Sequence, residues 1–170
     1  MNATVCAALF LSAGAAWMDL QYTKVDNGWL LLWFGTGLGI QLIRAGPGIL
    51  KECLPGMAVP VLLLFPFFYF RMLGAGDIKT LAVLGSMLGC RAIFSCIFLT
   101  FLLGAVLSLT TFLLDGGWQK RIQYLFSWLR QYLQTGQKTP YIKEGVQEES
   151  LHMTIPILMS VLLWAGGWYG

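Results

Sequence analysis

Long apolar stretches alternate with short polar ones along almost the whole chain. Helices that cross a bilayer need about 20 mostly apolar residues, so this alternation is typical of a polytopic helical membrane protein. The sequence therefore predicts an all-α membrane protein, a bundle of about six transmembrane helices that forms a single domain over residues 1–170. The apolar stretches cover residues 3–18, 29–43, 55–70, 77–90, 92–114 and 153–168.

The polar segments between these stretches carry helix and turn signals. Asp26 or Asn27 can cap the helix that follows, and Gly46-Pro47-Gly48 predicts a turn inside a loop over residues 44–54. The stretch 77–90 holds about 14 residues, which is too short to cross a bilayer alone, so we expect a buried central helix there.

Residues 118–133 differ from the other stretches because apolar and polar positions alternate with a helical period. This pattern predicts one amphipathic helix that lies in the membrane interface. With the polar residues that follow, it would form a cytoplasmic segment of about residues 115–152. The apolar positions are Trp118, Ile122, Leu125, Leu129 and Leu133.

The composition excludes an ordinary soluble domain and a nucleic-acid-binding protein. Charged residues make up 11% of the chain and hydrophobic residues 57%, whereas soluble domains are about one quarter charged. The net charge is only +3 and the basic residues are spread between apolar stretches, so we expect the lipid bilayer as a partner and no nucleic acid. We expect no metal and no cofactor, because there is one histidine and the cysteines lack metal-ligand spacing. These are Cys6, Cys53, Cys90 and Cys96.

The lysines and arginines predict the orientation. An even number of spans puts both termini on one side, and basic residues favour the cytoplasm. With the termini outside, only Arg44, Lys51 and Arg91 face away from it. We therefore expect a multi-pass protein of the cytoplasmic membrane whose cytoplasmic face carries Lys24, Arg71, Lys79, Lys120, Arg121, Arg130, Lys138 and Lys143.

Two aspartates lie at corresponding ends of apolar stretches. Asp19 closes the first stretch and Asp77 opens the fourth, so the expected topology puts both at similar depth on the cytoplasmic side. Two close carboxyl groups do not both ionise easily, so one keeps a proton and polarises a peptide carbonyl while the other takes a proton from water. The pair is a candidate for the catalytic residues of an aspartic protease. Because a helix N-terminus favours an anion, we expect Asp77 to be the base and Asp19 the proton-bearing partner.

The residues around Asp77 are candidates for substrate binding. Gly74, Ala75 and Gly76, here called the glycine strip, allow close approach by another chain, so we expect them to bind the substrate in extended form. Lys79 either stabilises an anionic aspartate pair or extends its amine to the membrane interface, and the sequence leaves both alternatives open.

These residues also carry a resemblance to a known family. Gly74-Ala75-Gly76-Asp77, followed by Leu84-Gly85-Ser86-Met87-Leu88-Gly89, resembles the GxGD signature of the type IV prepilin peptidase family. Asp19 followed by Val25-Asp26-Asn27 is similar to the family's first aspartate and its Ile-Pro-Asn loop, with Asp26 where proline is usual. Ile155-Pro156 also fits the family's C-terminal pattern. The resemblance implies a membrane aspartic endopeptidase that cuts the short basic leader from prepilin-like proteins at the cytoplasmic face.

The resemblance is to a short form of that family. Larger members carry a cysteine-rich cytoplasmic insert and methylate the new N-terminus. Here the loop over residues 21–28 is short and holds no tetracysteine cluster, so methylation is not implied. The short form resembles peptidases of archaeal preflagellin or of Flp/Tad-type pilus systems, and the sequence does not choose between them.

Two functions of other classes are compatible with the same residues. A small ion- or proton-coupled membrane transporter would use Asp19 and Asp77 as a relay, since acids inside the membrane often mark ion pathways. A noncatalytic component of a pilus or secretion machine would need neither carboxylate. Peptide cleavage that depends on both aspartates distinguishes the peptidase from these alternatives.

Overall fold

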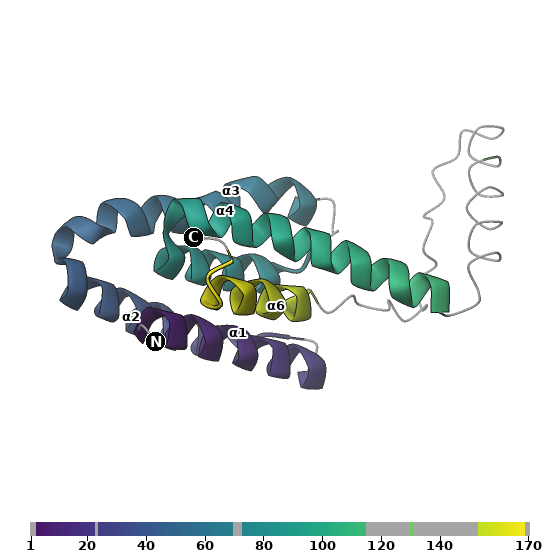
Figure 1. The fold of residues 1–170 in the computed structure, drawn as a ribbon, viewed down its shortest axis with the longest axis horizontal. Coiled ribbons are helices and arrows are strands. Elements are labelled where there is room, and N and C mark those ends of the chain that lie inside the picture. The colour runs from purple at the N-terminus through teal and green to yellow at the C-terminus, as the bar shows by residue number, and fades with distance from the viewer. Residues whose placement is uncertain (1–2, 23, 70–72, 115–129, 131–152, 169–170) are drawn as a thin grey trace. The chain divides into compact units, whose positions relative to one another are not determined.

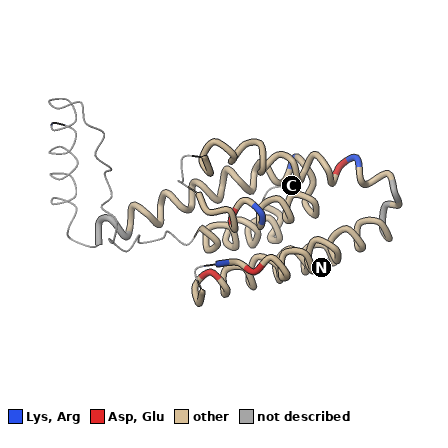
Figure 2. The backbone as a smooth tube through the Cα atoms, turned by 180° about the vertical axis from the view of Figure 1, so that it is seen from behind, with Lys and Arg blue, Asp and Glu red and all other residues tan. Residues whose placement is uncertain are grey.

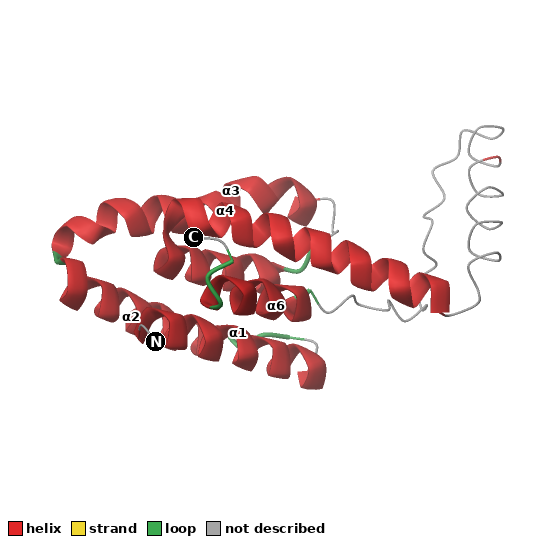
Figure 3. Ribbon diagram, viewed as in Figure 1, coloured by secondary structure: helices red, strands yellow, loops and turns green. Residues whose placement is uncertain are grey.

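The structure, a computed structural model, describes residues 3–22, 24–69, 73–114, 130 and 153–168. Within this part of the chain all regular elements are helices, which confirms the predicted all-α class (Figure 3). They are, with the labels of Figure 1, α1 (Ala3–Tyr22), α2 (Asn27–Ala45), the short 3-10 helix η1 (Pro47–Ile49), α3 (Leu50–Tyr69), α4 (Ala75–Leu114) and α6 (Thr154–Ala165).

The segment between α1 and α2 ends in a side-chain cap. Asp26 has an extended backbone, with φ −68° and ψ 134°, and its Oδ2 accepts a hydrogen bond of 3.2 Å from the backbone N–H of Trp29. This bond satisfies an amide group that has no partner within the first helical turn. Of the two predicted candidates, Asp26 is therefore the residue that caps α2.

α3 begins earlier than the apolar pattern predicted. The third stretch was expected over residues 55–70, whereas the helix already begins at Leu50. Lys51 and Glu52 are good helix formers but add nothing to an apolar pattern, so hydrophobicity alone missed this first turn. The helix then continues through three internal prolines, Pro55, Pro60 and Pro66.

α4 contains a break at Gly89. This residue has φ 79° and ψ 170°, a conformation that is essentially restricted to glycine. A Cβ built on Gly85 would lie 3.3 Å from Ile93 Cγ1, although positions so far apart in sequence are separated by about 12 Å along a straight helix. The chain therefore turns back at Gly89 (Figure 1). This turn agrees with the two separate stretches, 77–90 and 92–114, that the sequence predicted.

The first arm of α4, residues 75–88, supplies the centre of the core. Every residue from Thr80 to Met87 is buried, as expected for a short central helix. Gly85 packs so closely against Gly56 of α3 that a Cβ on either residue would overlap the backbone carbonyl of the other. α1 packs along α6 and α2. The apolar core joins these helices through Leu11, Leu30, Leu64, Leu84, Ile93, Ile157 and Val161.

The chain divides into two compact units. One comprises Met1–Gly104 with His152–Gly170, and the other comprises Ala105–Leu151. The second unit is described only at residues 105–114, the end of α4, and at Arg130. The predicted amphipathic helix at 118–133 and the segment 115–152 thus lie outside the described residues, Arg130 apart. The predicted single domain stays a prediction.

The chain is a helical membrane protein. Among the described residues, three helical segments are long and apolar enough to cross a bilayer by length and composition, namely Ala3–Tyr22, Leu50–Tyr69 and Ala75–Thr110. Figure 2 shows that charged residues lie near the ends of α1 and α3 and leave their middles uncharged. On α4, Arg91 lies beside the turn at Gly89. The predicted number of six spans is not confirmed. α2 contains glycines and Gln41, which lower its apolar content, and α6 has only 12 residues. The two arms of α4 belong to one helix with a turn at Gly89, so they count as a single segment.

Candidate functional site

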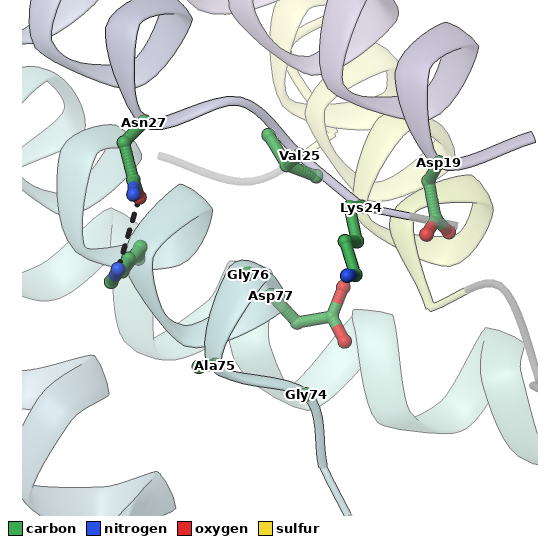
Figure 4. A pocket seen from close by; sticks show the side chains of 9 residues that line it. Asp19, Lys24, Val25, Asn27, Gly74, Ala75, Gly76 and Asp77 are labelled. Carbon is green, nitrogen blue, oxygen red and sulfur yellow. Dashed lines mark hydrogen bonds between the residues drawn. The ribbon is translucent and has the colours of Figure 1, made fainter. Parts of the chain in front are cut away.

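A cavity of about 350 Å³ opens where the last turn of α1, the segment before α2 and the first turn of α4 meet (Figure 4). Its lining holds two carboxylates, two ammonium groups, one amide and a stretch of backbone with little side-chain bulk. The formal charges of these groups cancel, so the cavity combines acids and bases without a net charge. The lining residues are Asp19, Lys24, Val25, Asn27, Gly74, Ala75, Gly76, Asp77 and Lys79.

The two aspartates reach this cavity from helices that are distant in sequence. α1 continues to Tyr22, so Asp19 lies in its last turn. α4 begins at Ala75, so Asp77 lies in its first turn. The structure thus brings together at one cavity every residue that the sequence singled out for the site, which are Asp19, Gly74, Ala75, Gly76, Asp77 and Lys79.

Within the glycine strip, Gly74 is needed for space rather than for an unusual backbone. None of the residues in the strip is among the described glycines with a positive φ. A Cβ on Gly74 would come within 3.1 Å of Asp77 Oδ2, a tight contact, whereas a Cβ on Gly76 would meet Val25 Cγ2 at an ordinary 3.6 Å. The absence of a side chain at Gly74 therefore leaves room for the Asp77 carboxylate.

The two lysines of the cavity have different surroundings. Lys79 Nζ donates a hydrogen bond of 3.0 Å to Asn27 Oδ1, drawn as the dashed line in Figure 4, and so connects α4 to the start of α2. The side chain of Lys24 extends toward the Asp77 carboxylate in the same view. The sequence had treated Lys24 only as a topology signal, because a loop lysine between two helices carries no motif of its own.

A further polar residue holds Asp19 from outside the cavity lining. Thr154 Oγ1, in the first turn of α6, donates a hydrogen bond of 2.7 Å to Asp19 Oδ2. Thr154 is only 1% exposed. Sequence reasoning missed it, since no spacing rule links positions so far apart. The available signal was a hydroxyl at the head of an otherwise apolar stretch, directly before Ile155-Pro156.

This arrangement is suited to general acid–base chemistry on a peptide. A carboxylate can accept a proton from water, and a carboxyl group can donate a hydrogen bond to the carbonyl that the water attacks. The two lysines supply positive charge beside the carboxylates. Ala75 and Gly76 lie in the first turn of α4, where backbone N–H groups have no partner within the helix and can donate to the carbonyl groups of a bound peptide.

Comparison with known proteins adds one finding. The sequence profile described as the type IV leader peptidase family matches residues 5–109, a range that contains every cavity residue named above and ends before α6. No curated protein matches the chain. No solved structure matches it either.

Proposed function

The chain belongs to the type IV leader peptidase family, and from this premise we propose that it is an aspartic endopeptidase that removes the short leader peptide from type IV prepilin-like precursors. Its catalytic residues are Asp19 and Asp77. Its substrates are membrane proteins of the pilin, pseudopilin or Flp/preflagellin type, each with an apolar helix directly after the leader.

One observation carries this proposal. Asp19 and Asp77, on α1 and α4, line the same cavity together with the glycine strip. An acid at the end of a membrane helix is costly to keep without a function. Two acids beside an open stretch of backbone are what the hydrolysis of an extended peptide requires.

In the proposed reaction Asp77 takes a proton from the attacking water, and Asp19 donates a hydrogen bond to the scissile carbonyl. The first turn of α4 favours the anionic form at Asp77, whereas Asp19 lies near the C-terminus of α1, where the helix dipole does not. As the water adds, the proton of Asp19 passes to the carbonyl oxygen. When the tetrahedral intermediate collapses, the C–N bond breaks, Asp77 gives the proton that it took from water to the leaving amine nitrogen, and Asp19 regains its own proton as the carbonyl re-forms.

The proposed topology puts this chemistry at the cytoplasmic face. The termini lie outside, and the helical segments α1, α2, α3, the two arms of α4 and α6 make six passes, the short ones inside the bundle. The distribution of basic residues supports this orientation, because Lys24 and Lys79 both line the cavity. The apolar helix of the substrate lies against the bundle, and its leader junction binds along residues 74–76.

The test is cleavage of prepilin-like reporters in membranes by the wild type, Asp19→Asn and Asp77→Asn, scored as a gel shift. Asp26→Asn is a matched control: Asp26 is an aspartate of the same region that does not line the cavity, and asparagine caps a helix as well as aspartate does. We expect both cavity variants to lose cleavage while remaining folded, and the control to retain it.

Other outcomes separate the alternatives. Cleavage that survives either cavity substitution removes that aspartate from the catalytic pair. If the wild type cuts no member of a broad prepilin panel but conducts protons or a solute in liposomes, and both Asp→Asn changes abolish this flux, the transporter is favoured. If pilus or secretion assembly continues in cells that carry either variant, the noncatalytic component is favoured.

A further inference from the structure

The hydrogen bond between Thr154 and Asp19 joins two helices that lie at opposite ends of the chain. The residues are 135 positions apart, and the bond of 2.7 Å has the short length typical of a hydroxyl that donates to a carboxylate. Thr154 is buried and does not line the cavity. Thr154 therefore cannot contact a substrate in the cavity, and it can act on one only through Asp19 or through the packing of α6.

The position of Thr154 is itself defined by packing. A Cβ on Gly104 of α4 would lie 3.3 Å from Met153 Sδ and 3.6 Å from Pro156 Cγ, so the first turn of α6 rests directly on the backbone of α4 at this glycine. Thr154, Pro156 and Ile157 are all buried. The hydroxyl is thus presented to Asp19 from a well-packed part of the core.

Asp19 needs such a partner for two reasons. It lies in the last turn of α1, and terminal turns open more readily than helix middles. In addition, the torsion that orients a carboxyl group is broad, so the backbone alone does not fix the direction of its oxygens. A hydrogen bond from a buried residue of a separate helix restrains both the turn and the carboxyl group.

A hydroxyl is also suited to a carboxyl group that changes its protonation state. It donates to a carboxylate oxygen and, after rotation about the C–O bond, accepts from a protonated carboxyl group, while the heavy atoms stay in place. An aspartate that gives up and regains a proton in each catalytic cycle is thus held in one position throughout.

We propose that Thr154 is a positioning residue that orients Asp19 for catalysis through the Thr154 Oγ1–Asp19 Oδ2 hydrogen bond. This inference rests on the proposed function, since it takes Asp19 as a catalytic residue. It extends the functional site to α6, which lies beyond the range matched by the family profile.

The test compares Thr154→Val, which keeps the shape but removes the hydroxyl, with Thr154→Ser, which keeps the hydroxyl. We expect Thr154→Val to lower kcat by about 10- to 100-fold, because small errors in the position of a catalytic group have effects of that size. KM should change by less than about 2-fold, since Thr154 does not contact the cavity. Thr154→Ser should restore kcat to within about 3-fold of the wild type.

Ser160→Ala is the matched control within the same helix. Ser160 is buried, and its Oγ donates to Cys96 O over 3.0 Å and lies 3.4 Å from Cys96 Sγ, remote in sequence from Asp19. We expect Ser160→Ala to remove a buried hydroxyl from α6 without changing kcat. If Ser160→Ala lowers kcat as strongly as Thr154→Val, the effect belongs to the packing of α6 and the proposal is wrong.

Two further results would overturn the proposal: a wild-type kcat in Thr154→Val, or equal losses in the Val and Ser variants. If Thr154→Val does not fold, Thr154→Ala takes its place in the comparison with Thr154→Ser. Asp19→Asn in the same assay separates this proposal from the proposed function. An active Asp19→Asn refutes the aspartate pair, whereas an inactive Asp19→Asn beside a fully active Thr154→Val refutes only the role of Thr154.

Discussion

Lys79, near the start of α4, donates a hydrogen bond of 3.0 Å from its Nζ to Oδ1 of Asn27, the first residue of α2, and so connects two helices across 52 positions of sequence. Both residues line the cavity. The bond joins the two helices on either side of the cavity near Asp77. It also assigns Lys79 a defined partner, which neither sequence alternative for this residue had included.

Loss of the hydrogen bond between Lys79 and Asn27 should weaken substrate binding more than it lowers the stability of the fold. We expect Lys79→Met and Asn27→Ala each to raise KM by about 3- to 10-fold, and to change stability by less than about 1 kcal/mol, because the bond is exposed to solvent. The double variant should raise KM by less than the product of the two single effects, since both substitutions remove the same hydrogen bond. Steady-state kinetics on a reporter peptide measure this, and additive effects would show that the two residues act separately.

Lys24 should contribute through its charge. Its side chain extends toward the Asp77 carboxylate in Figure 4, and a positive charge there offsets the negative charge of the aspartate pair. We expect Lys24→Met to lower kcat/KM by about 10-fold, which corresponds to about 1.4 kcal/mol, and Lys24→Arg to stay within about 3-fold of the wild type. Equal losses in both variants would mean that the shape of the lysine matters and its charge does not.

The contact between Gly56 and Gly85 should be intolerant of any side chain. A Cβ on either residue would overlap the carbonyl of the other, so Gly56→Ala and Gly85→Ala should each destabilise the protein by about 1–3 kcal/mol through overpacking. Thermal melts in detergent measure this. Gly35→Ala and Gly39→Ala in α2 are the controls, because a Cβ there meets nothing within 4 Å. These two should be neutral or slightly stabilising.

Gly89 should be sensitive for a different reason. A Cβ there meets nothing within 4 Å, but its φ of 79° is strained for any residue with a side chain. Gly89→Ala should therefore cost about 1–3 kcal/mol from the backbone alone. Gly48→Ala, equally open but without a positive φ, should cost much less. Comparable melting temperatures for the two variants would show that the positive φ at Gly89 carries no strain cost for alanine.

Features that depend on neighbouring residues could be predicted from the sequence alone. Apolar stretches defined the helices, Asp26 was one of two candidates for the cap, and the spacing around Asp77 indicated the family. The turn at Gly89 was not predicted from that glycine, although it falls at the boundary between the apolar stretches 77–90 and 92–114. Such features are local, because capping, helical periodicity and glycine conformations act within a few residues of the chain. Hydrophobicity was less reliable for helix ends, as the early start of α3 at Leu50 shows.

Which distant groups meet depends on how the helices pack, and this could not be predicted from the sequence. The packing of α1, α2, α4 and α6 accounts for three such relationships. Lys79 bonds to Asn27, Lys24 extends toward Asp77, and Thr154 donates a hydrogen bond to Asp19. A lysine or a threonine carries no sequence signal for a partner 52 or 135 positions away. Close packing between helices, such as that of Gly104 against Met153 and Pro156, fixes their relative positions and so determines which side chains meet.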